Sequence, residues 1–237
     1  MFGKLTKGLK YARKAFSCLK MGGVVRTVVF NFRVFPFKTA IKMPVLLASG
    51  VEVRCCKRGS LKFENISRIR CGMLWIGLLD LEYTYRKRCL INIKGEFIVK
   101  GDGFHCFAPG TIIYVGEKAR MAIGNNVSFS HDNKFYIKKG LSIGDDNMWS
   151  YYNVIMDNDG HPLYDKDGKI VNENREIAFG NKVWMGCHCT VCKGVNIPDG
   201  TVIATNSVVR KSINQPNCAI STNNILRENI DWSRNLI

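Results

Sequence analysis

The sequence predicts a mainly β solenoid. Three observations support this: a strict six-residue repeat, small residues where tight corners are needed, and one polar insertion within the repeat. An apolar residue recurs at every sixth position: Phe179, Met185, Val191, Ile197, Ile203 and Val209. A helix repeats every 3.6 residues and a strand every two, so neither explains a period of six. Short fixed periods are typical of solenoids, in which each coil stacks an apolar side chain above the last.

The residue after each repeat position is mostly small, which permits a tight corner: Gly180, Gly186, Cys192, Pro198 and Ala204. Glycine supplies backbone angles there that other residues reach only with strain. The repeat sharpens from Ile123, and the step from Ile143 to Phe179 is 36 residues, a whole multiple of six. Residues 60–120 show weaker strand alternation with several Gly corners, which we interpret as early, irregular coils of the same solenoid.

Three further segments complete the chain. Residues 24–48 are rich in Val, Phe and Ile and contain two prolines, which predicts short strands joined by turns. The polar, aperiodic segment 157–176 is expected to form a loop extruded from the coil, and such loops tend to carry function. Residues 214–217 end the solenoid, and the tail is expected to pack back as a cap through Ile225, Leu226, Ile230 and Trp232. The predicted domains are a basic N-terminal extension at 1–60, the solenoid at 61–215 and the C-terminal cap at 216–237.

Length and composition narrow the class of protein. The chain has 237 residues and 46% hydrophobic content, enough to bury a substantial core, so wholesale disorder is excluded. No run approaches the roughly 18 apolar residues of a membrane-spanning helix, and the N-terminus does not resemble a signal peptide. The ten cysteines are scattered. We interpret them as reduced thiols and expect a cytoplasmic protein, peripheral to the membrane if the N-terminal segment binds lipid.

The net charge of +16 is unevenly distributed. Residues 1–60 contain thirteen Lys or Arg and a single acidic residue, Glu52, which leaves +12 in the first quarter of the chain. Apolar residues within 2–19 recur at spacings of three and four, which predicts an amphipathic helix with a basic face. Three partners fit such a helix: the rest of its own protein, an anionic membrane surface bound through residues 1–20, or nucleic acid. No nucleic-acid motif accompanies the charge, so nucleic acid is the least favoured.

Several segments of the chain resemble a known family. They include the Ile-Gly-Asp-Asp run at 143–146, the Gly-His-Pro run at 160–162 and the Val-Trp-Met-Gly run at 183–186. In these segments the chain resembles the hexapeptide-repeat acyltransferases, and among them the sugar and polysaccharide O-acetyltransferases of the maltose, galactoside and capsule-modifying kind. The match covers roughly residues 95–232. It implies a left-handed parallel β-helix, a homotrimer, an active site in each groove between neighbouring protomers, and acetyl-CoA as the donor.

The resemblance implies that His161, on the extruded loop, is the catalytic base. The chemistry suits it, because a neutral imidazole can take the proton of a sugar hydroxyl as that hydroxyl attacks a thioester. Asp157 and Asp159 flank this histidine and could orient its ring or bind the acceptor. Ser130 falls near the position at which relatives hold the acceptor, and it is a further acceptor candidate.

The resemblance also implies residues for the donor. Trp184 matches a residue that lines the groove, whereas Cys187 and Thr205 match positions beside the pantetheine arm. Basic residues near the nucleotide end fit the phosphates of CoA, and the candidates are Arg210, Lys211 and Arg227. The chain departs from the family at 220–224, where a rigid proline turn and a basic residue are missing.

Other functions remain open at this stage. The Cys-His-Cys run at 187–189 suggests a metal, but Cys189 falls on an inward position of the repeat and the spacing of a structural zinc site is absent. The γ-type carbonic anhydrases share this solenoid, but the four histidines lack the close spacing of zinc ligands, so no metal is expected. The alternatives retained are N-acyl transfer to an amino sugar and a non-catalytic β-helix scaffold.

Overall fold

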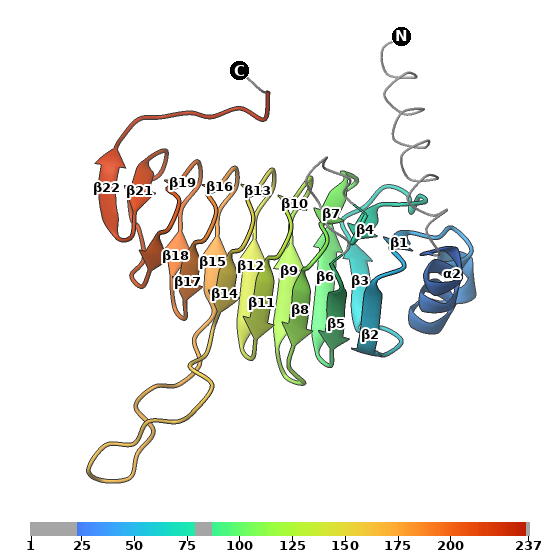
Figure 1. Cartoon of the computed structure of the whole chain (residues 1–237), viewed down its shortest axis with the longest axis horizontal. Coiled ribbons are helices and arrows are strands. Elements are labelled where there is room, and N and C mark those ends of the chain that lie inside the picture. The colour runs from blue at the N-terminus through green and yellow to red at the C-terminus, as the bar shows by residue number, and fades with distance from the viewer. Residues whose placement is uncertain (1–22, 79–86, 236–237) are drawn as a thin grey trace.

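The computed structural model describes residues 23–78 and 87–235 of the chain. Within these residues the chain winds into a long three-sided prism of β-strands, with a helix at one end and a loop projecting from one edge (Figure 1). The helix predicted at residues 2–19, with its possible membrane partner, lies outside the described residues. Among the described helices, none is both long and apolar enough to cross a bilayer.

Three sheets form the walls of the prism, named here sheets A, B and C. Sheet A contains β1 (Val45–Leu47), β4 (Leu74–Ile76), β7 (His105–Phe107), β10 (Ser128–Phe129), β13 (Met148–Trp149), β16 (Trp184–Met185), β19 (Val202–Ile203), β21 (Ala219–Ser221) and β22 (Asn224–Arg227). Sheet B contains β2 (Val51–Cys56), β5 (Cys89–Ile93), β8 (Ile112–Val115), β11 (Lys134–Ile137), β14 (Val154–Met156), β17 (Thr190–Cys192) and β20 (Val208–Val209). Sheet C contains β3 (Leu61–Glu64), β6 (Glu96–Lys100), β9 (Arg120–Ile123), β12 (Gly140–Ile143), β15 (Ile177–Phe179) and β18 (Asn196–Ile197).

Along most of the prism each strand pairs in parallel with the strand three places along the chain, so three strands make one coil. The predicted solenoid is therefore confirmed, including its early, irregular coils between residues 60 and 120. The ladders begin with β1 and β2, which pair with β4 and β5. The predicted domain boundaries stay a prediction. Strands β1 and β2 pair with the coils although they precede residue 61, the predicted start of the solenoid.

The side chains at the six-residue repeat positions fill the inside of the prism. All six predicted inward positions are buried: Phe179, Met185, Val191, Ile197, Ile203 and Val209. Aromatic rings contact one another along the axis in the middle coils: Phe107 stacks on Phe129 with ring centroids 4.5 Å apart, and Phe129 meets Trp149 edge to face at 4.8 Å. The apolar ladder is thus the core that holds successive coils together.

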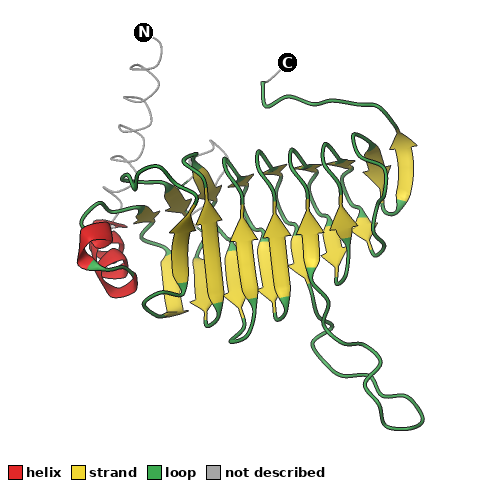
Figure 2. Cartoon of the chain, turned by 180° about the vertical axis from the view of Figure 1, so that it is seen from behind, coloured by secondary structure: helices red, strands yellow, loops and turns green. Residues whose placement is uncertain are grey.

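Residues 24–48 are a correction to the sequence prediction. Instead of strands joined by turns, they form α2 (Gly23–Val34), α3 (Phe37–Ala40) and only one strand, β1 (Figure 2). The β-branched residues favoured a strand, but tertiary contacts determine the secondary structure of this segment. Thr27 and Asn31, one helical turn apart, both reach the backbone of β1.

The C-terminal segment caps the prism by hydrogen bonds. Strand β22 pairs antiparallel with β21, which covers one sheet edge, and the indole N–H of Trp232 donates to the carbonyl of Lys182 at 2.8 Å. The expected apolar packing of Ile225 and Leu226 is wrong, since 43% and 61% of these side chains are exposed. They lie on the terminal hairpin, beyond the last coil that could bury them.

A buried histidine in β7 predicts how stability depends on pH. The ring of His105 faces the carbonyls of Met73, Lys100 and Gly124, and burial lowers its pKa below the usual value of 6.5. The unfolded chain therefore binds a proton that the folded chain excludes, so the free energy of unfolding falls as the pH drops below about 6.5.

We expect urea unfolding followed by circular dichroism to show this loss between about pH 7.5 and pH 5.5, and His105→Gln to reduce the slope. The slope with pH is the readout, because the substitution itself can lower stability at every pH. Equal slopes for the two proteins would show that His105 does not cause the effect.

Candidate active site

The candidate base lies on a loop that leaves the prism between sheets B and C. Residues 157–176 follow β14 and precede β15, and they project away from the coils (Figure 1). The two arms of the loop pair: the N–H of Val171 donates to the carbonyl of Leu163 at 2.9 Å, and an isolated bridge joins Tyr164 to Ile170. The projection is therefore an ordered hairpin with His161 at its base.

One asparagine closes the neck of this loop. The side-chain amide of Asn172 donates to the carbonyl of His161 and to a carboxylate oxygen of Asp159, each at 2.9 Å. Its side-chain oxygen accepts the N–H of Leu163 at 2.7 Å. These contacts fix the backbone on both sides of His161 while its side chain stays exposed. The backbone that carries the candidate base is therefore held in place before a substrate arrives.

An ion pair joins the loop neck to the next coil. Lys193, in the turn after β17, contacts a carboxylate oxygen of Asp159 and donates to the carbonyl of Asn172 at 2.7 Å. The hydrogen bond from Lys193 holds the pKa of Asp159 below its usual value, so this carboxylate stays charged close to His161. Asp159 and His161 line an open hollow of about 340 Å³, and Lys138 lines it as well.

Asp157 has a different position from the one predicted. It is fully buried, and its two oxygens accept the N–H groups of Lys138, Lys139 and Gly140 at 2.6–2.8 Å. A carboxylate that is buried and occupied by three donors cannot bind an acceptor sugar. We therefore correct the substrate-binding assignment of Asp157: this residue ties the start of the loop to the neighbouring turn.

Replacement of Asp157 by alanine is expected to lower the free energy of unfolding by at least about 2 kcal/mol, because it leaves backbone N–H groups of the neighbouring turn unpaired. Denaturant unfolding measures the loss. Asp167→Ala, an exposed carboxylate at the tip of the same loop, is the matched control and should change stability by less than about 0.5 kcal/mol. A similar small effect at both positions would contradict the structural role of Asp157.

Three of the predicted donor and acceptor residues lie along a different edge, between sheets A and B. Ser130, Cys187 and Thr205 occupy the corners after β10, β16 and β19, and the Cys187 sulfur lies 3.6 Å from the Thr205 hydroxyl. Trp184 lies beside this edge on sheet A and is 41% exposed. Within the chain, therefore, these residues do not share an edge with the loop of His161.

The predicted basic residues are distributed over two places. Arg210 and Lys211 follow β20 and are exposed at the edge from which the loop of His161 leaves. Asn223 holds the backbone of both, accepting the N–H of Arg210 at 3.1 Å and donating to the carbonyl of Lys211 at 2.9 Å. Arg227 ends β22 and is exposed on the terminal hairpin.

An aromatic cluster that was not predicted lies at the edge between sheets A and B. The ring of His131 stacks on Tyr151 at 4.9 Å, and the ring of Tyr152 stacks on His188 at the same distance. Lys87 donates to the hydroxyl of Tyr152 at 2.8 Å. The signal was present in the sequence, because Ser-His-Asp-Asn at 130–133 and Ser-Tyr-Tyr-Asn at 150–153 occupy equivalent corners.

Two members of this cluster have unusual backbone angles. Tyr152 and His188 have φ of 61° and 58°, a left-handed conformation that is rare for bulky residues. The same conformation recurs at the equivalent corners of neighbouring coils, where Asp132 and Asn206 each have φ of 60°, so it belongs to the regular turns of the prism. The stacked rings lie at the same edge as Ser130, Cys187 and Thr205, and together they form a candidate binding surface.

The cysteines near this edge do not form a metal centre. Cys189 is buried inside the coil, as its inward repeat position predicted, and its sulfur faces the carbonyls of Cys187 and Ala204. Across residues 23–78 and 87–235, no three His, Cys, Asp or Glu side chains gather closely enough to hold a metal ion.

Fold and site together define a class of protein: a parallel β-helix of hexapeptide repeats that carries a histidine on an ordered, extruded loop. The galactoside O-acetyltransferase of Escherichia coli K12 is 31% identical over 131 residues, covering 51% of this chain and 58% of that protein. A polysialic acid O-acetyltransferase of Escherichia coli O1:K1 is 29% identical over 146 residues, covering 60% of this chain and 42% of that protein. The matched region thus spans about half the length of these curated relatives. No family model matches the chain.

A solved structure has the same fold. The polysialic acid O-acetyltransferase OatWY superposes with a TM-score of 0.51 at 22% identity, covering 81% of this chain and 88% of that chain. At this identity the likeness concerns the fold alone, and it confirms the predicted left-handed parallel β-helix. The curated relatives confirm the resemblance to hexapeptide-repeat sugar and polysaccharide O-acetyltransferases.

Proposed function

We propose that this protein is an O-acetyltransferase that moves an acetyl group from acetyl-CoA to a hydroxyl of a sugar or cell-surface polysaccharide precursor. The observation that carries the proposal is the geometry of His161, exposed on an ordered loop whose neck is closed by Asn172 and by the Asp159–Lys193 pair. The galactoside and polysialic acid O-acetyltransferases among the relatives support the reaction class.

In the proposed reaction His161 acts as general base. Its neutral imidazole takes the proton of the acceptor hydroxyl as the oxygen attacks the thioester carbonyl carbon. The tetrahedral oxyanion then collapses, the carbon–sulfur bond breaks, and the imidazolium returns the proton to the leaving thiolate. Asp159 and His161 line the same hollow, so the carboxylate is available to contact the acceptor beside the base. No metal enters this scheme.

The remaining candidates would act across a groove between two copies of the chain. His161 and the surface that contains Trp184, Cys187 and Thr205 lie on different edges of one prism, so a homotrimer would bring the loop of one copy to the binding edge of the next. In this arrangement Ser130 contacts the acceptor. Arg210, Lys211 and Arg227 are exposed cations available to the phosphates of CoA.

Acetyl transfer is tested by incubating the full-length protein with acetyl-CoA and a panel of neutral, acidic and amino sugars. Free thiol release measures turnover, and mass spectrometry identifies the acetylated product. Mild alkali removes an O-acetyl ester but leaves an N-acetyl amide intact, so it separates the proposed reaction from N-acyl transfer. If no sugar and no oligosaccharide raised thiol release above the background hydrolysis of acetyl-CoA, the result would favour a non-catalytic scaffold. It would overturn the proposal.

A further inference from the structure

Helix α2 covers the N-terminal end of the prism with a mixed face, on which Thr27 and Asn31 are buried beside Phe30 and Val34. The side-chain amide of Asn31 donates to the carbonyl of Val45 at 2.7 Å, and the hydroxyl of Thr27 accepts the N–H of Leu47 at 2.9 Å. Both polar side chains are buried. They satisfy backbone groups of β1 that no other strand pairs, because β1 is the outermost strand of sheet A.

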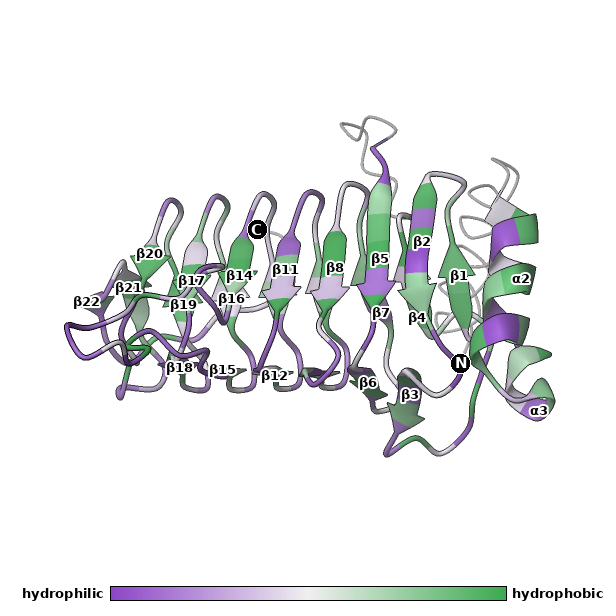
Figure 3. Cartoon of the chain, turned by 90° about the horizontal axis from the view of Figure 1, so that it is seen from below, coloured by the Kyte–Doolittle hydropathy of each residue, from purple (hydrophilic) through white to green (hydrophobic). Residues whose placement is uncertain are grey.

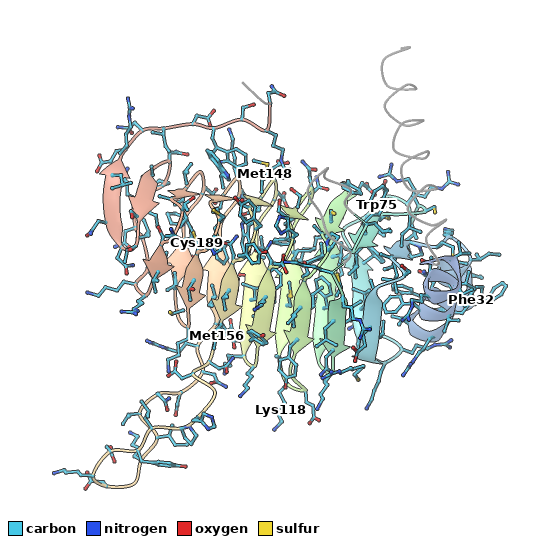
Figure 4. The ribbon with its side chains drawn as sticks, in the orientation of Figure 1. Phe32, Trp75, Lys118, Met148, Met156 and Cys189 are labelled. Carbon is cyan, nitrogen blue, oxygen red and sulfur yellow. The ribbon has the colours of Figure 1, made fainter. Side chains whose placement is uncertain are left out.

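This orientation turns an apolar stripe of the helix outward. Val25, Val28, Val29 and Phe32 follow the spacing i, i+3, i+4, i+7 of one helical face, and 72%, 38%, 59% and 37% of these residues are exposed. Phe32 projects from the end of the molecule, away from the coils (Figure 4). Helix α2 is thus apolar on part of its buried face, at Phe30 and Val34, and again on its outward face.

The short helix α3 extends the stripe. Phe37 and Ile41 are 67% and 58% exposed, and the ring of Phe37 lies 5.8 Å from that of Phe32. Figure 3 shows α2 beyond β1 and α3 at the lower end of α2, with green hydrophobic segments in both helices. Seven of the sixteen exposed large apolar residues that the structure describes fall within residues 24–41. Such concentrations mark interaction surfaces, whereas single exposed apolar residues do not.

The charge around this stripe is positive throughout. Arg33, Lys38 and Lys42 are exposed at its border, and the sequence contains no acidic residue before Glu52. Residues 1–42 contain ten Lys or Arg. An apolar stripe bordered by cations complements a surface with a negatively charged outer layer and an apolar layer beneath it, as in an anionic phospholipid bilayer.

We propose that the outward face of α2 and α3, made of Val25, Val28, Val29, Phe32, Phe37 and Ile41, docks on an anionic phospholipid surface. The apolar side chains enter the boundary between headgroups and acyl chains, while Arg33, Lys38 and Lys42 contact the headgroups. In this orientation the end of the prism opposite β22 faces the phospholipid surface. This inference is independent of the proposed acetyl transfer.

Co-sedimentation of the full-length protein with vesicles tests the docking surface. Wild type is expected to bind vesicles of phosphatidylcholine with 30% phosphatidylglycerol and to bind pure phosphatidylcholine much more weakly. The triple variant V25S/V29S/F37S should bind anionic vesicles at least about tenfold more weakly, because three exposed apolar side chains are lost. The charge variant R33E/K38E should lose binding as well, and added salt should weaken wild-type binding.

The matched control is the triple variant L163S/V171S/L226S, whose residues are 59%, 59% and 61% exposed but lie far along the chain from α2. It should bind anionic vesicles as wild type does. Circular dichroism and a melting curve check that every variant keeps the β-helix. Wild-type affinity in V25S/V29S/F37S, or equal loss in the control, overturns the proposal. A lipid-free assembly that V25S/V29S/F37S breaks into smaller units also overturns it, because the face would then contact a second copy.

Discussion

Replacing His161 by alanine is expected to lower kcat for acetyl transfer by about 10²–10⁴-fold, the usual contribution of a general base. The neck of the loop depends on the backbone carbonyl of His161, which alanine keeps, so Asn172 can still close the neck. The loss should therefore fall on kcat, with little change in KM for acetyl-CoA. Steady-state kinetics with the best acceptor of the panel provides the measurement.

The control for this prediction lies on the same loop. Lys166 is exposed near its tip, and Lys166→Ala should keep kcat within about twofold of wild type, which corresponds to less than about 0.5 kcal/mol. A loss of equal size in both variants would mean that the loop matters as a whole and that the imidazole has no specific role. Unchanged kcat in His161→Ala would remove the general base from the account.

The largest expected effect on stability comes from the aromatic core. Phe129 is 1% exposed and its ring contacts those of Phe107, Phe135 and Trp149 at centroid distances of 4.5–5.1 Å. Alanine at this position removes the ring and leaves a cavity that stacked coils cannot close, at a cost of about 3–5 kcal/mol. Equilibrium unfolding in guanidinium chloride provides the measurement.

An exposed apolar residue provides the comparison. Leu226 is 61% exposed on the terminal hairpin, so Leu226→Ala should change the free energy of unfolding by less than about 0.5 kcal/mol. If Phe129→Ala cost no more than Leu226→Ala, the apolar ladder would not be the source of stability in the prism.

The coils were predictable because one physical requirement repeats at every turn. Each inward position must be apolar and each corner must be tight, so the pattern at Phe179, Met185 and Val191 reports the fold without knowledge of distant contacts. The structure confirms this pattern, since all three residues are buried. Repeat proteins are unusually readable for this reason, because every coil contacts mainly its neighbours.

The N-terminal helices were not predictable in the same way. Residues 24–34 contain five valines, and β-branched residues favour strands. Their helix exists because Thr27 and Asn31 satisfy the open edge of β1, a partner that lies 14 to 20 residues further along the chain. Local propensity has no information about such an edge.

The candidate site was predictable only at the residues that belong to a recognisable sequence motif. The Gly-His-Pro run drew attention to His161, but the neighbouring Asp157 carried no sign of its three backbone donors. The stack of Tyr152 on His188 joins residues 36 positions apart. Its recognition requires the number of residues in each coil, which the insertion at 157–176 obscures.

A crystal structure of the protein with bound CoA tests the central claim most directly. The account predicts a trimer in which the CoA sulfur lies within about 4 Å of an imidazole nitrogen of His161, in a groove between two copies, so that the base and the thioester can react. A CoA molecule whose sulfur is far from every His161, or a protomer with no neighbour across that groove, would contradict it.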